Sequence, residues 1–328
     1  MIKQIIPNVF SINIILPGSP LKNLNSYVIK SSQRSLIIDT GFNMPECYDA
    51  LYDGIKELGI CMDETDIFVT HLHADHSGLV PAIAGNGTKV YMSTADSDIL
   101  SRALNSDMYM EKNDEIYLSE GFPGDELIKL RDLNPAIKLA PKQRIDFTPI
   151  NDGDVICVGD TELICVSTPG HSPGHVCLYN DKHKAMFLGD HVLFDITPNI
   201  TTWMEMPDSL AIYMESLDKI RNYNVDLPLP AHRGNSGLTM EERVDQLFEH
   251  HRNRLSDTLN TVLVNPGIDG YNVASKLKWS IRARSWAEFP LAQKWFAFGE
   301  ALAHLYYLVM NGRLKKDNIK GVFRYYTC

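Results

Sequence analysis

The amino-acid sequence predicts an α/β protein whose β-rich first part is followed by a mainly helical C-terminal part. Strand-like segments and then strand–helix alternation fill residues 1–100, and short strands resume after residue 148. Beyond Gly237, apolar residues recur at helical spacing as far as residue 310. The chain has 328 residues, whereas one domain usually holds about 100 to 200 residues. We therefore expect two domains, residues 1–238 and residues 239–328.

Composition excludes several classes of protein. Hydrophobic residues make up 44% of the chain and charged residues 22%, which is typical of a globular protein and excludes disorder. No run approaches the roughly 18 apolar residues of a membrane span, so no membrane partner is expected. Pro7, Asn8 and Asn13 interrupt any signal-peptide core, which predicts a cytoplasmic location. The six cysteines are scattered without a CxxC pair, so disulfides need not be assumed.

The first hundred residues predict a sheet with helical crossovers. Residues 25–31 and 34–40 are expected to form paired strands. In residues 45–58 the apolar side chains recur at helical spacing behind Pro45, which favours a helix start because its missing N–H is not needed there. Residues 66–70 predict a short buried strand that runs into a polar cluster on a loop, ahead of a helix beginning near Ser77.

The middle of the chain predicts an acidic helical insertion and then a second set of strands. Residues 103–148 are expected to form the insertion, with two helices split by Gly121, Pro123 and Gly124. Four strands at hairpin spacing should follow in residues 154–160, 161–170, 175–181 and 184–190. A helix over residues 207–223 and a strand over residues 227–230 complete the first part.

The C-terminal part predicts a small basic module. Helices are expected over residues 239–263, 271–281 and 291–310, and then a hairpin that turns at residues 315–318, the order of a winged-helix-like module. After His250 the chain has 12 Lys and Arg against 5 Asp and Glu, a net charge of +7, whereas residues 1–250 carry −17 of the total of −10. Such asymmetry suggests an anionic ligand or a docking contact.

Residues 70–76, with the sequence THLHADH, form the densest polar cluster. Because alternate residues on a chain leaving a strand point the same way, His71 and His73 can bind one cation while Asp75 and His76 face a second. Imidazole and carboxylate ligands suit Zn, Fe or Mn, and the absence of thiolate argues against a closed structural zinc site. Three further residues, each at the end of a predicted strand, can supply the missing ligands: His171, Asp190 and His232.

These motifs resemble those of the metallo-β-lactamase fold superfamily over roughly residues 1–235. The HLHADH run matches the HxHxDH motif of the family, and IIDTG, TPGHSPGH, LGD and PAH stand in the family's order. The resemblance implies an αββα sandwich with two divalent metal ions, zinc being expected and Fe or Mn being alternatives. It places His71, His73 and His171 on the first ion, Asp75, His76 and His232 on the second, and Asp190 between them. The flavodiiron branch is disfavoured because it has an acid where His73 stands.

The ligand set implies a hydrolase that uses metal-bound hydroxide, because metal binding lowers the pKa of water from 15.7 to about 7. Asp75 is also placed to accept a proton from the bound water, which makes it the candidate catalytic residue. The third motif and the acidic body favour a small acyl substrate, an ester, thioester or lactone, as in the glyoxalase II and lactonase branches. One alternative is a metal-dependent ribonuclease whose basic C-terminal module holds the nucleic acid. A mononuclear iron dioxygenase is a third hypothesis, disfavoured by the complete second ligand set.

Other histidines and one aspartate are expected to lie outside the ligand set. Asp39 is expected to cap backbone N–H groups, and His175 to support the site by hydrogen bonding. For His191 a supporting role and a structural role stay open. The remaining histidines have no polar constellation around them and are expected to be solvated or in the core: His183, His250, His251 and His304.

The insertion carries a group of Met and aromatic residues with two interpretations. They either line a substrate pocket over the metals, as part of a lid, or form the inner face of a helical hairpin packed on the body. The group consists of Met108, Tyr109, Met110, Tyr117 and Phe122.

Overall fold

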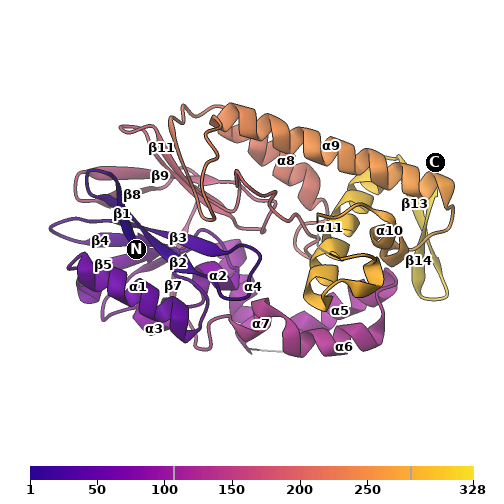
Figure 1. Cartoon of the computed structure of the whole chain (residues 1–328), viewed down its shortest axis with the longest axis horizontal. Coiled ribbons are helices and arrows are strands. Elements are labelled where there is room, and N and C mark those ends of the chain that lie inside the picture. Colours follow the sequence, from indigo (N-terminus) through magenta and orange to yellow (C-terminus); the bar gives the residue numbers. More distant parts are fainter. Residues whose placement is uncertain (106–107, 281–282) are drawn as a thin grey trace.

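The fold is a four-layer sandwich of helices, sheet, sheet and helices, with a helical part attached at one end (Figure 1). The computed structural model describes residues 1–105, 108–280 and 283–328. Two sheets of seven and five strands lie face to face, and helices cover the outer face of each. The predicted α/β class and the αββα order are thereby confirmed.

The first sheet follows chain order from edge to edge. Its strands are β1 (Ile2–Ile6), β2 (Val9–Ile15), β3 (Asn23–Ile29), β4 (Ser35–Ile38), β5 (Thr65–Phe68), β6 (Val90–Ser93) and β7 (Phe147–Ile150). Strands β1 to β4 are antiparallel, and the predicted pairing of β3 with β4 is confirmed by Val28 opposite Ile37. From β4 to β7 the strands are parallel, so the carboxyl ends of β4, β5 and β6 meet at one edge of the sheet.

The second sheet has the order β12-β11-β10-β9-β8. Its strands are β8 (Val155–Val158), β9 (Thr161–Ser167), β10 (Val176–Asn180), β11 (Ala185–Gly189) and β12 (Leu227–Pro230), all of which the sequence predicted. The pairs are antiparallel except β11 with β12, which are parallel. Strands β9, β11 and β12 therefore run in the same direction, and their carboxyl ends also lie at one edge.

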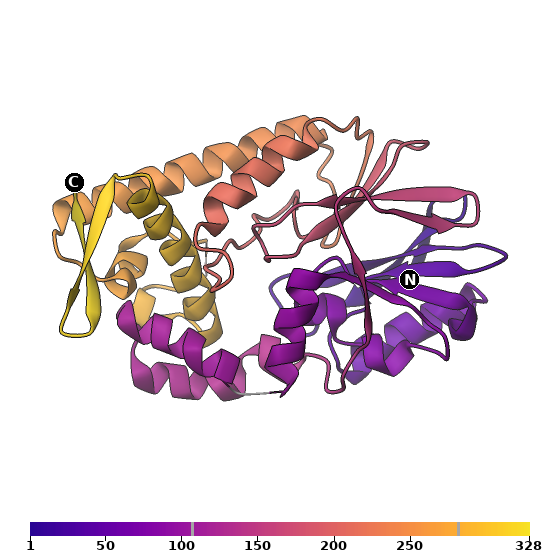
Figure 2. The same cartoon turned by 180° about the vertical axis from the view of Figure 1, so that it is seen from behind.

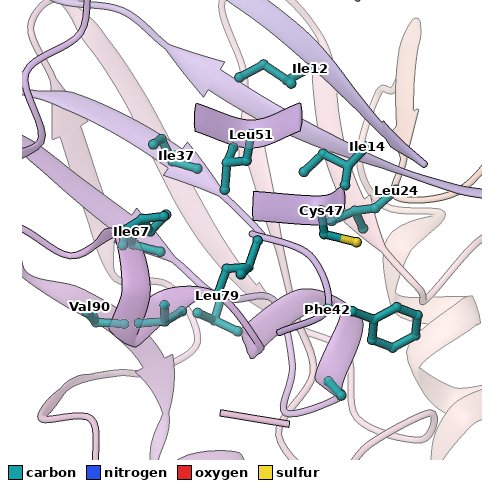
Figure 3. Packing of buried hydrophobic residues seen from close by; sticks show 14 of the residues in the cluster. Ile12, Ile14, Leu24, Ile37, Phe42, Cys47, Leu51, Ile67, Leu79 and Val90 are labelled. Atoms are coloured by element: carbon teal, nitrogen blue, oxygen red, sulfur yellow. The ribbon is translucent and has the colours of Figure 1, made fainter. Parts of the chain in front are cut away.

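Alternation along the strands separates two cores of the sandwich. In β4, Ile38 faces the second sheet, whereas Ile37 faces the outer helices, as expected for a side-chain period of two. Figure 3 shows Cys47 and Leu51 of α1 (Pro45–Glu57) among the outward side chains of this sheet. Burying each such leucine stabilises the fold by about 1.5–3 kcal/mol. Gly54 lets α1 approach β2, because a Cβ there would lie 2.7 Å from the side chain of Ile12.

The outer face of the second sheet packs against α8 (Ser209–Ile220) and α9 (Met240–Val264). Tyr213 of α8 and Leu247 of α9 are fully buried in this core. The start of α9 is fixed by a capping box, in which Thr239 and Glu242 each satisfy the other's backbone N–H. As Figure 1 shows, α9 runs beyond the sandwich into the helical part.

The helical part combines the predicted insertion with the C-terminal segment (Figure 2). Its elements are α4 (Thr94–Asn105), α5 (Met108–Ser119), α6 (Gly124–Leu133), α7 (Pro135–Lys138), α10 (Gly270–Lys276), α11 (Leu291–Met310), β13 (Leu314–Ile319) and β14 (Val322–Thr327). The ring of Tyr117 in α5 lies 4.9 Å from that of Phe298 in α11, and Phe122 packs on the same ring at 5.0 Å. Tyr117 and Phe122 are therefore core residues of a cluster that joins both segments. The division at residue 238 stays a prediction.

Three local predictions differ from the structure. The polar cluster is not wholly on a loop, because a short helix, α2 (Ala74–Ser77), begins at Ala74 and a further one, α3 (Val80–Ile83), follows. Helix α10 ends at Lys276, and residues 277–280 are not helical, so the helix predicted over residues 271–281 is shorter than expected; residue 281 itself lies outside the described residues. The C-terminal hairpin does not turn at residues 315–318, which lie within β13. It turns at Lys320 and Gly321, whose φ angles of 55° and 88° suit a two-residue hairpin loop.

Short 3₁₀ helices at Met62–Glu64 and Trp286–Glu288 complete the regular elements that the structure describes. All six cysteines are free. Within the described ranges, no helix has the length and apolar character needed to cross a membrane.

Candidate metal centre

All seven predicted ligands come together where the two sheets share an edge. His71 and His73 follow β5, His73 stands at the N-cap position of α2, and α2 carries Asp75 and His76 in its single turn. The other three residues follow strands of the second sheet: His171 after β9, Asp190 after β11 and His232 after β12. The strand directions described above bring these loops together, so residues up to 161 positions apart in the chain share one site.

One group of ring nitrogens gathers around His73. Its Nδ1 lies 2.9 Å from Nε2 of His71 and 2.9 Å from Nε2 of His171. Oδ2 of Asp190 lies 3.5 Å from Nε2 of His171. Ligands at about 2.0–2.1 Å from a tetrahedral zinc ion are about 3.3 Å apart, so this group has the spacing of a set of metal ligands.

A second group gathers around His232 and Asp75. Oδ2 of Asp75 lies 3.3 Å from Nε2 of His232 and 3.8 Å from Nε2 of His76. Oδ1 of Asp190 lies 3.2 Å from Nε2 of His232 and 3.6 Å from Nε2 of His76. Asp190 thus presents one carboxylate oxygen to each group, which is the arrangement that a bridging ligand requires.

The hydrogen bonding of these atoms fits the binding of cations. Four buried atoms have no hydrogen-bond partner among the described residues: Asp75 Oδ2, His76 Nε2, Asp190 Oδ1 and His232 Nε2. Leaving a buried polar atom unsatisfied costs about 1–3 kcal/mol, more if it is charged, and native proteins rarely do so. Imidazole and carboxylate donors at this spacing would be satisfied together by divalent ions, so the residues fit the metals that the resemblance implies.

The second ring nitrogen of three histidines is held by the surrounding protein, which aims Nε2 at the centre. The hydrogen bonds join His76 Nδ1 to Asp39 Oδ2 at 2.7 Å, His171 Nδ1 to the carbonyl of Asn199 at 2.8 Å, and His232 Nδ1 to the carbonyl of Asn23 at 2.7 Å. Such outer partners fix the tautomer and the orientation of metal-binding imidazoles.

The electrostatics of the site favour the metal-binding form of His73 and Asp190 but the protonated form of His232. Burial, reinforced by the neighbouring His171, lowers the pKa of His73 to about 3, which keeps its ring neutral. Burial opposes ionisation of Asp190, but the nearby His232 and His76 outweigh it and hold its pKa well below 3.8. Burial also opposes the charging of His232, yet the Asp190 carboxylate raises its pKa well above 6.5. Asp190 and His232 therefore form a pair of opposite charges, and a metal cation would compete with the protonated His232 for the Asp190 carboxylate.

Asp39 acts as the sequence suggested and also supports a ligand. Its Oδ1 accepts a hydrogen bond from the backbone N–H of Thr70 at 2.9 Å, while Oδ2 holds His76. Its φ of 61° lies in the left-handed region, which Asp tolerates better than most residues.

His175 and its neighbour Gly189 position the backbone of Asp190. Nδ1 of His175 pairs with Oγ1 of Thr168 at 2.8 Å, and Nε2 accepts from the N–H of Asp190 at 3.1 Å. The supporting role predicted for His175 is consistent with these contacts. Gly189 has a φ of 49°, and a Cβ there would lie 2.5 Å from Nε2 of His175, so the close approach requires glycine.

Asp96 is a supporting residue that the sequence did not reveal. It lies at the start of α4, fully buried, and accepts hydrogen bonds from Leu72 N (2.9 Å), Ser172 Oγ (2.6 Å) and Gly174 N (2.6 Å). Burial raises its pKa to about 6, although these three donors oppose the rise. Asp96 thereby ties the loop of His71 and His73 to the loop of His171. The sequence contained one signal for this role, because Asp96 follows β6, a strand that ends at the same sheet edge as the candidate centre.

A second missed feature links the centre to the C-terminal helices. Asn199, whose carbonyl holds His171, donates from Nδ2 to Oε2 of Glu300 in α11 at 3.3 Å. Glu300 is also 3.4 Å from the guanidinium of Arg254 in α9. The orientation of one candidate ligand, His171, therefore depends on residues about 30 to 130 positions further along the chain.

The other histidines separate into core and surface groups. His251 and His304 are fully buried and hydrogen-bond to each other at 3.1 Å, in agreement with the expected core role. His191 is buried against the ring of Tyr213 at 5.3 Å, and its ring nitrogens have no hydrogen-bond partner in the described part of the chain. This favours the structural role for His191. His183 lies in the turn between β10 and β11, and His250 lies 3.8 Å from Glu300.

Comparison with known families identifies the fold family. Residues 21–232 match the metallo-beta-lactamase superfamily, and residues 287–328 match the metallo-beta-lactamase-like C-terminal domain. The first match spans more than half of the chain, so the chain belongs to the metallo-beta-lactamase superfamily. The resemblance noted in the sequence is thereby confirmed. The winged-helix interpretation of the C-terminal part stays a prediction.

Curated relatives include proteins named as thioesterases. An atrochrysone carboxyl ACP thioesterase from Emericella nidulans is 29% identical over 231 residues, which cover 70% of this chain and 57% of that protein. A lactamase-like protein from Pestalotiopsis fici is 26% identical over 264 residues, 77% of this chain and 67% of that protein. The chain thus spans little more than half the length of the thioesterase relative.

Solved structures extend the similarity to the whole chain. A metallo-beta-lactamase family protein from Thermus thermophilus has a TM-score of 0.81 and 24% identity, covering 98% of this chain and 99% of that one. A beta-lactamase domain protein from Burkholderia ambifaria has a TM-score of 0.83 and 24% identity, covering 100% and 94%. These structures share the fold, including the helical C-terminal part.

Proposed function

We propose that the protein is a metal-dependent hydrolase that cleaves an acyl thioester at a centre of two divalent ions. The observation that carries the proposal is the pair of buried ligand groups joined by the two oxygens of Asp190. In this proposal the first ion is held by His71, His73 and His171, and the second by Asp75, His76 and His232. Zinc is the proposed metal, and the same ligands accept Fe or Mn.

The thioester is proposed from the relatives, and the hydrolase class from the superfamily. The relative from Emericella nidulans is named a thioesterase, a hydrolase of thioester bonds, and 70% of this chain aligns with it. A small acyl substrate, predicted from the sequence as an ester, thioester or lactone, is thereby narrowed to the thioester. Esters and lactones share the acyl carbon that such a centre would activate, and they serve as comparison substrates.

The residues of the chain have separable roles in this reaction. When bound, two divalent ions would lower the pKa of water toward about 7 and polarise the scissile carbonyl. Asp75 accepts the proton of the attacking water at its carboxylate, which is 6% exposed and has Oδ2 without a donor among the described residues. Asp39, Asn23 and the carbonyl of Asn199 hold three imidazoles in one orientation. Because burial keeps His71 and His73 neutral, these rings offer lone pairs at neutral pH.

The alternative ribonuclease function loses support from the pairing of basic residues. Four of the basic side chains after His250 are engaged in intramolecular ion pairs: Lys316 with Glu120 (3.1 Å), Arg324 with Asp269 (2.6 Å), Lys294 with Glu126 (2.9 Å) and Arg254 with Glu300 (3.4 Å). These four of the 12 basic side chains after His250 are engaged within the protein, which makes them less available for phosphates.

The test is hydrolysis by purified protein of known metal content. The panel contains acyl thioesters, esters, lactones and a labelled single-stranded RNA, with Asp75→Ala as the matched inactive variant. We expect metal-dependent cleavage of thioesters that is lost in Asp75→Ala. Cleavage of RNA alone, or thioester cleavage that survives removal of the metal, would contradict the proposal.

A further inference from the structure

The candidate centre is most accessible at His73. Six of its seven predicted ligands are buried, and His73 alone is partly exposed. These burial values favour the approach of a substrate past His73. The indole of Trp203 lies on this side, with its ring nearly parallel to that of His73 at 6.0 Å.

Trp203 is held rigidly beside the centre. Its Nε1 donates a hydrogen bond to the carbonyl of His171 at 3.2 Å, so it touches the loops of two candidate ligands. Its backbone pairs with that of Met206 in a short bridge, which fixes the loop that carries it. The indole thus lies next to both His73 and the backbone of His171.

Trp203 also lines a pocket of about 320 Å³. Trp203 and Met204 line one side of it, Ile116 of α5 a second, and Tyr306 and Val309 of α11 a third. Parts of the chain separated by about 190 residues line it, and most of these side chains are apolar.

The cation at the pocket is already neutralised. Lys316 lies 3.1 Å from the buried carboxylate of Glu120, and its ammonium stands over the rings of Tyr306 and Phe323 at 4.2 and 4.1 Å. A phosphate of a carrier thiol would have to compete with Glu120 for this charge. An apolar group does not compete with Glu120, because its burial against the apolar lining is favourable by itself.

We infer that this pocket binds the apolar acyl chain of the substrate, with Trp203 as the residue that links the pocket to the surroundings of His73. The inference rests on the proposed function, because it assumes that the acyl carbon is held at the centre. It predicts that the enzyme discriminates between acyl chains by length. Full burial of each added methylene would raise kcat/KM by up to about fourfold until the pocket is filled.

The test measures kcat/KM for straight-chain acyl thioesters from acetyl to decanoyl, each presented on N-acetylcysteamine and on coenzyme A. Ile116→Trp fills the pocket and should reduce the ratio of long-chain to short-chain kcat/KM by at least tenfold. The matched control is Ile128→Trp, which places the same side chain on α6 at a site that is 70% exposed and outside the pocket. The control should keep the wild-type ratio.

A second measurement needs no variant. Straight-chain carboxylates, the products of the reaction, should inhibit the wild-type enzyme competitively, with inhibition constants that fall as the chain lengthens. A flat dependence on acyl length in both measurements would overturn the inference while leaving thioester hydrolysis intact. If kcat/KM differs only between the two thiol carriers and not between acyl chains, the pocket binds the thiol part of the substrate, and the inference is overturned. Absence of hydrolysis of every thioester would refute the proposed function and this inference with it.

Discussion

The replacement Asp96→Asn tests whether one buried carboxylate organises the two loops that carry His73 and His171. Asn has nearly the shape of Asp, but its amide nitrogen cannot accept a hydrogen bond. If the remaining oxygen keeps the bonds from Leu72 N and Ser172 Oγ, the N–H of Gly174 faces an NH₂ group instead of an acceptor. The variant then loses one charge-assisted bond and leaves a buried donor unsatisfied.

The magnitude follows from these contacts. A hydrogen bond to a charged group contributes about 1.5–3 kcal/mol, and an unsatisfied buried donor costs about 1–3 kcal/mol. Because the two values describe overlapping parts of one loss, we expect destabilisation of about 2–3 kcal/mol. Loss of an outer partner typically weakens metal binding by about 10- to 100-fold, and we expect a loss in this range for the ion held by His73 and His171.

The assay combines thermal unfolding of the metal-free protein with metal titration of the folded protein, both at pH 8, where Asp96 is ionised. Asp98→Asn is the matched control, since Asp98 lies on the same helix and is exposed. It should unfold and bind metal as the wild type does. Wild-type stability and wild-type metal affinity in Asp96→Asn would refute the reasoning.

Three further changes test other parts of the site and the fold. Asp190→Asn should abolish turnover while far-ultraviolet circular dichroism stays that of the wild type, and full activity at measured metal content would contradict its place between the two groups. Burial lowers the pKa of His304 to about 4 from 6.5, so the unfolded chain binds more protons between these values, and stability is lost as the pH falls from 6.5 to 4. The loss of unfolding free energy attributable to His304 is about 3 kcal/mol. Denaturant titrations across this pH range should show that the unfolding free energy of His304→Leu depends less on pH than that of the wild type. An unchanged pH dependence in this variant would contradict the role given to His304. Gly189→Ala forces a Cβ toward His175 at a positive φ and should lower the unfolding midpoint by several degrees, whereas an unchanged midpoint would show that the loop relaxes without cost.

Sequence patterns were sufficient where short-range periodicity decides the structure. The strand at residues 227–230 and the helix at residues 291–310 have the predicted bounds. The strand is a short apolar run, and the helix is a mainly apolar segment that lies between Pro290 and Asn311. The seven candidate ligands were also found from the sequence, because each follows a strand at one sheet edge and belongs to a recognisable motif.

The missed features depend on contacts between distant parts of the chain. Asp96 acquires its role only when the loops of Leu72 and Ser172 meet around it. Glu300 lies on α11, and the sequence alone does not show whether its side chain faces solvent or the interior. The hairpin turn was predicted at the wrong residues because its first residue, Lys320, adopts a positive φ that is not typical of lysine.

The most direct test of the central claim is titration of metal-free protein with Zn²⁺ while thioester hydrolysis is followed. The account predicts that activity rises to a plateau at two equivalents of metal per chain, and that His232→Ala, which removes a ligand of the second group only, never reaches it. A plateau at one equivalent, or full activity in His232→Ala, would contradict a centre built from two metal ions.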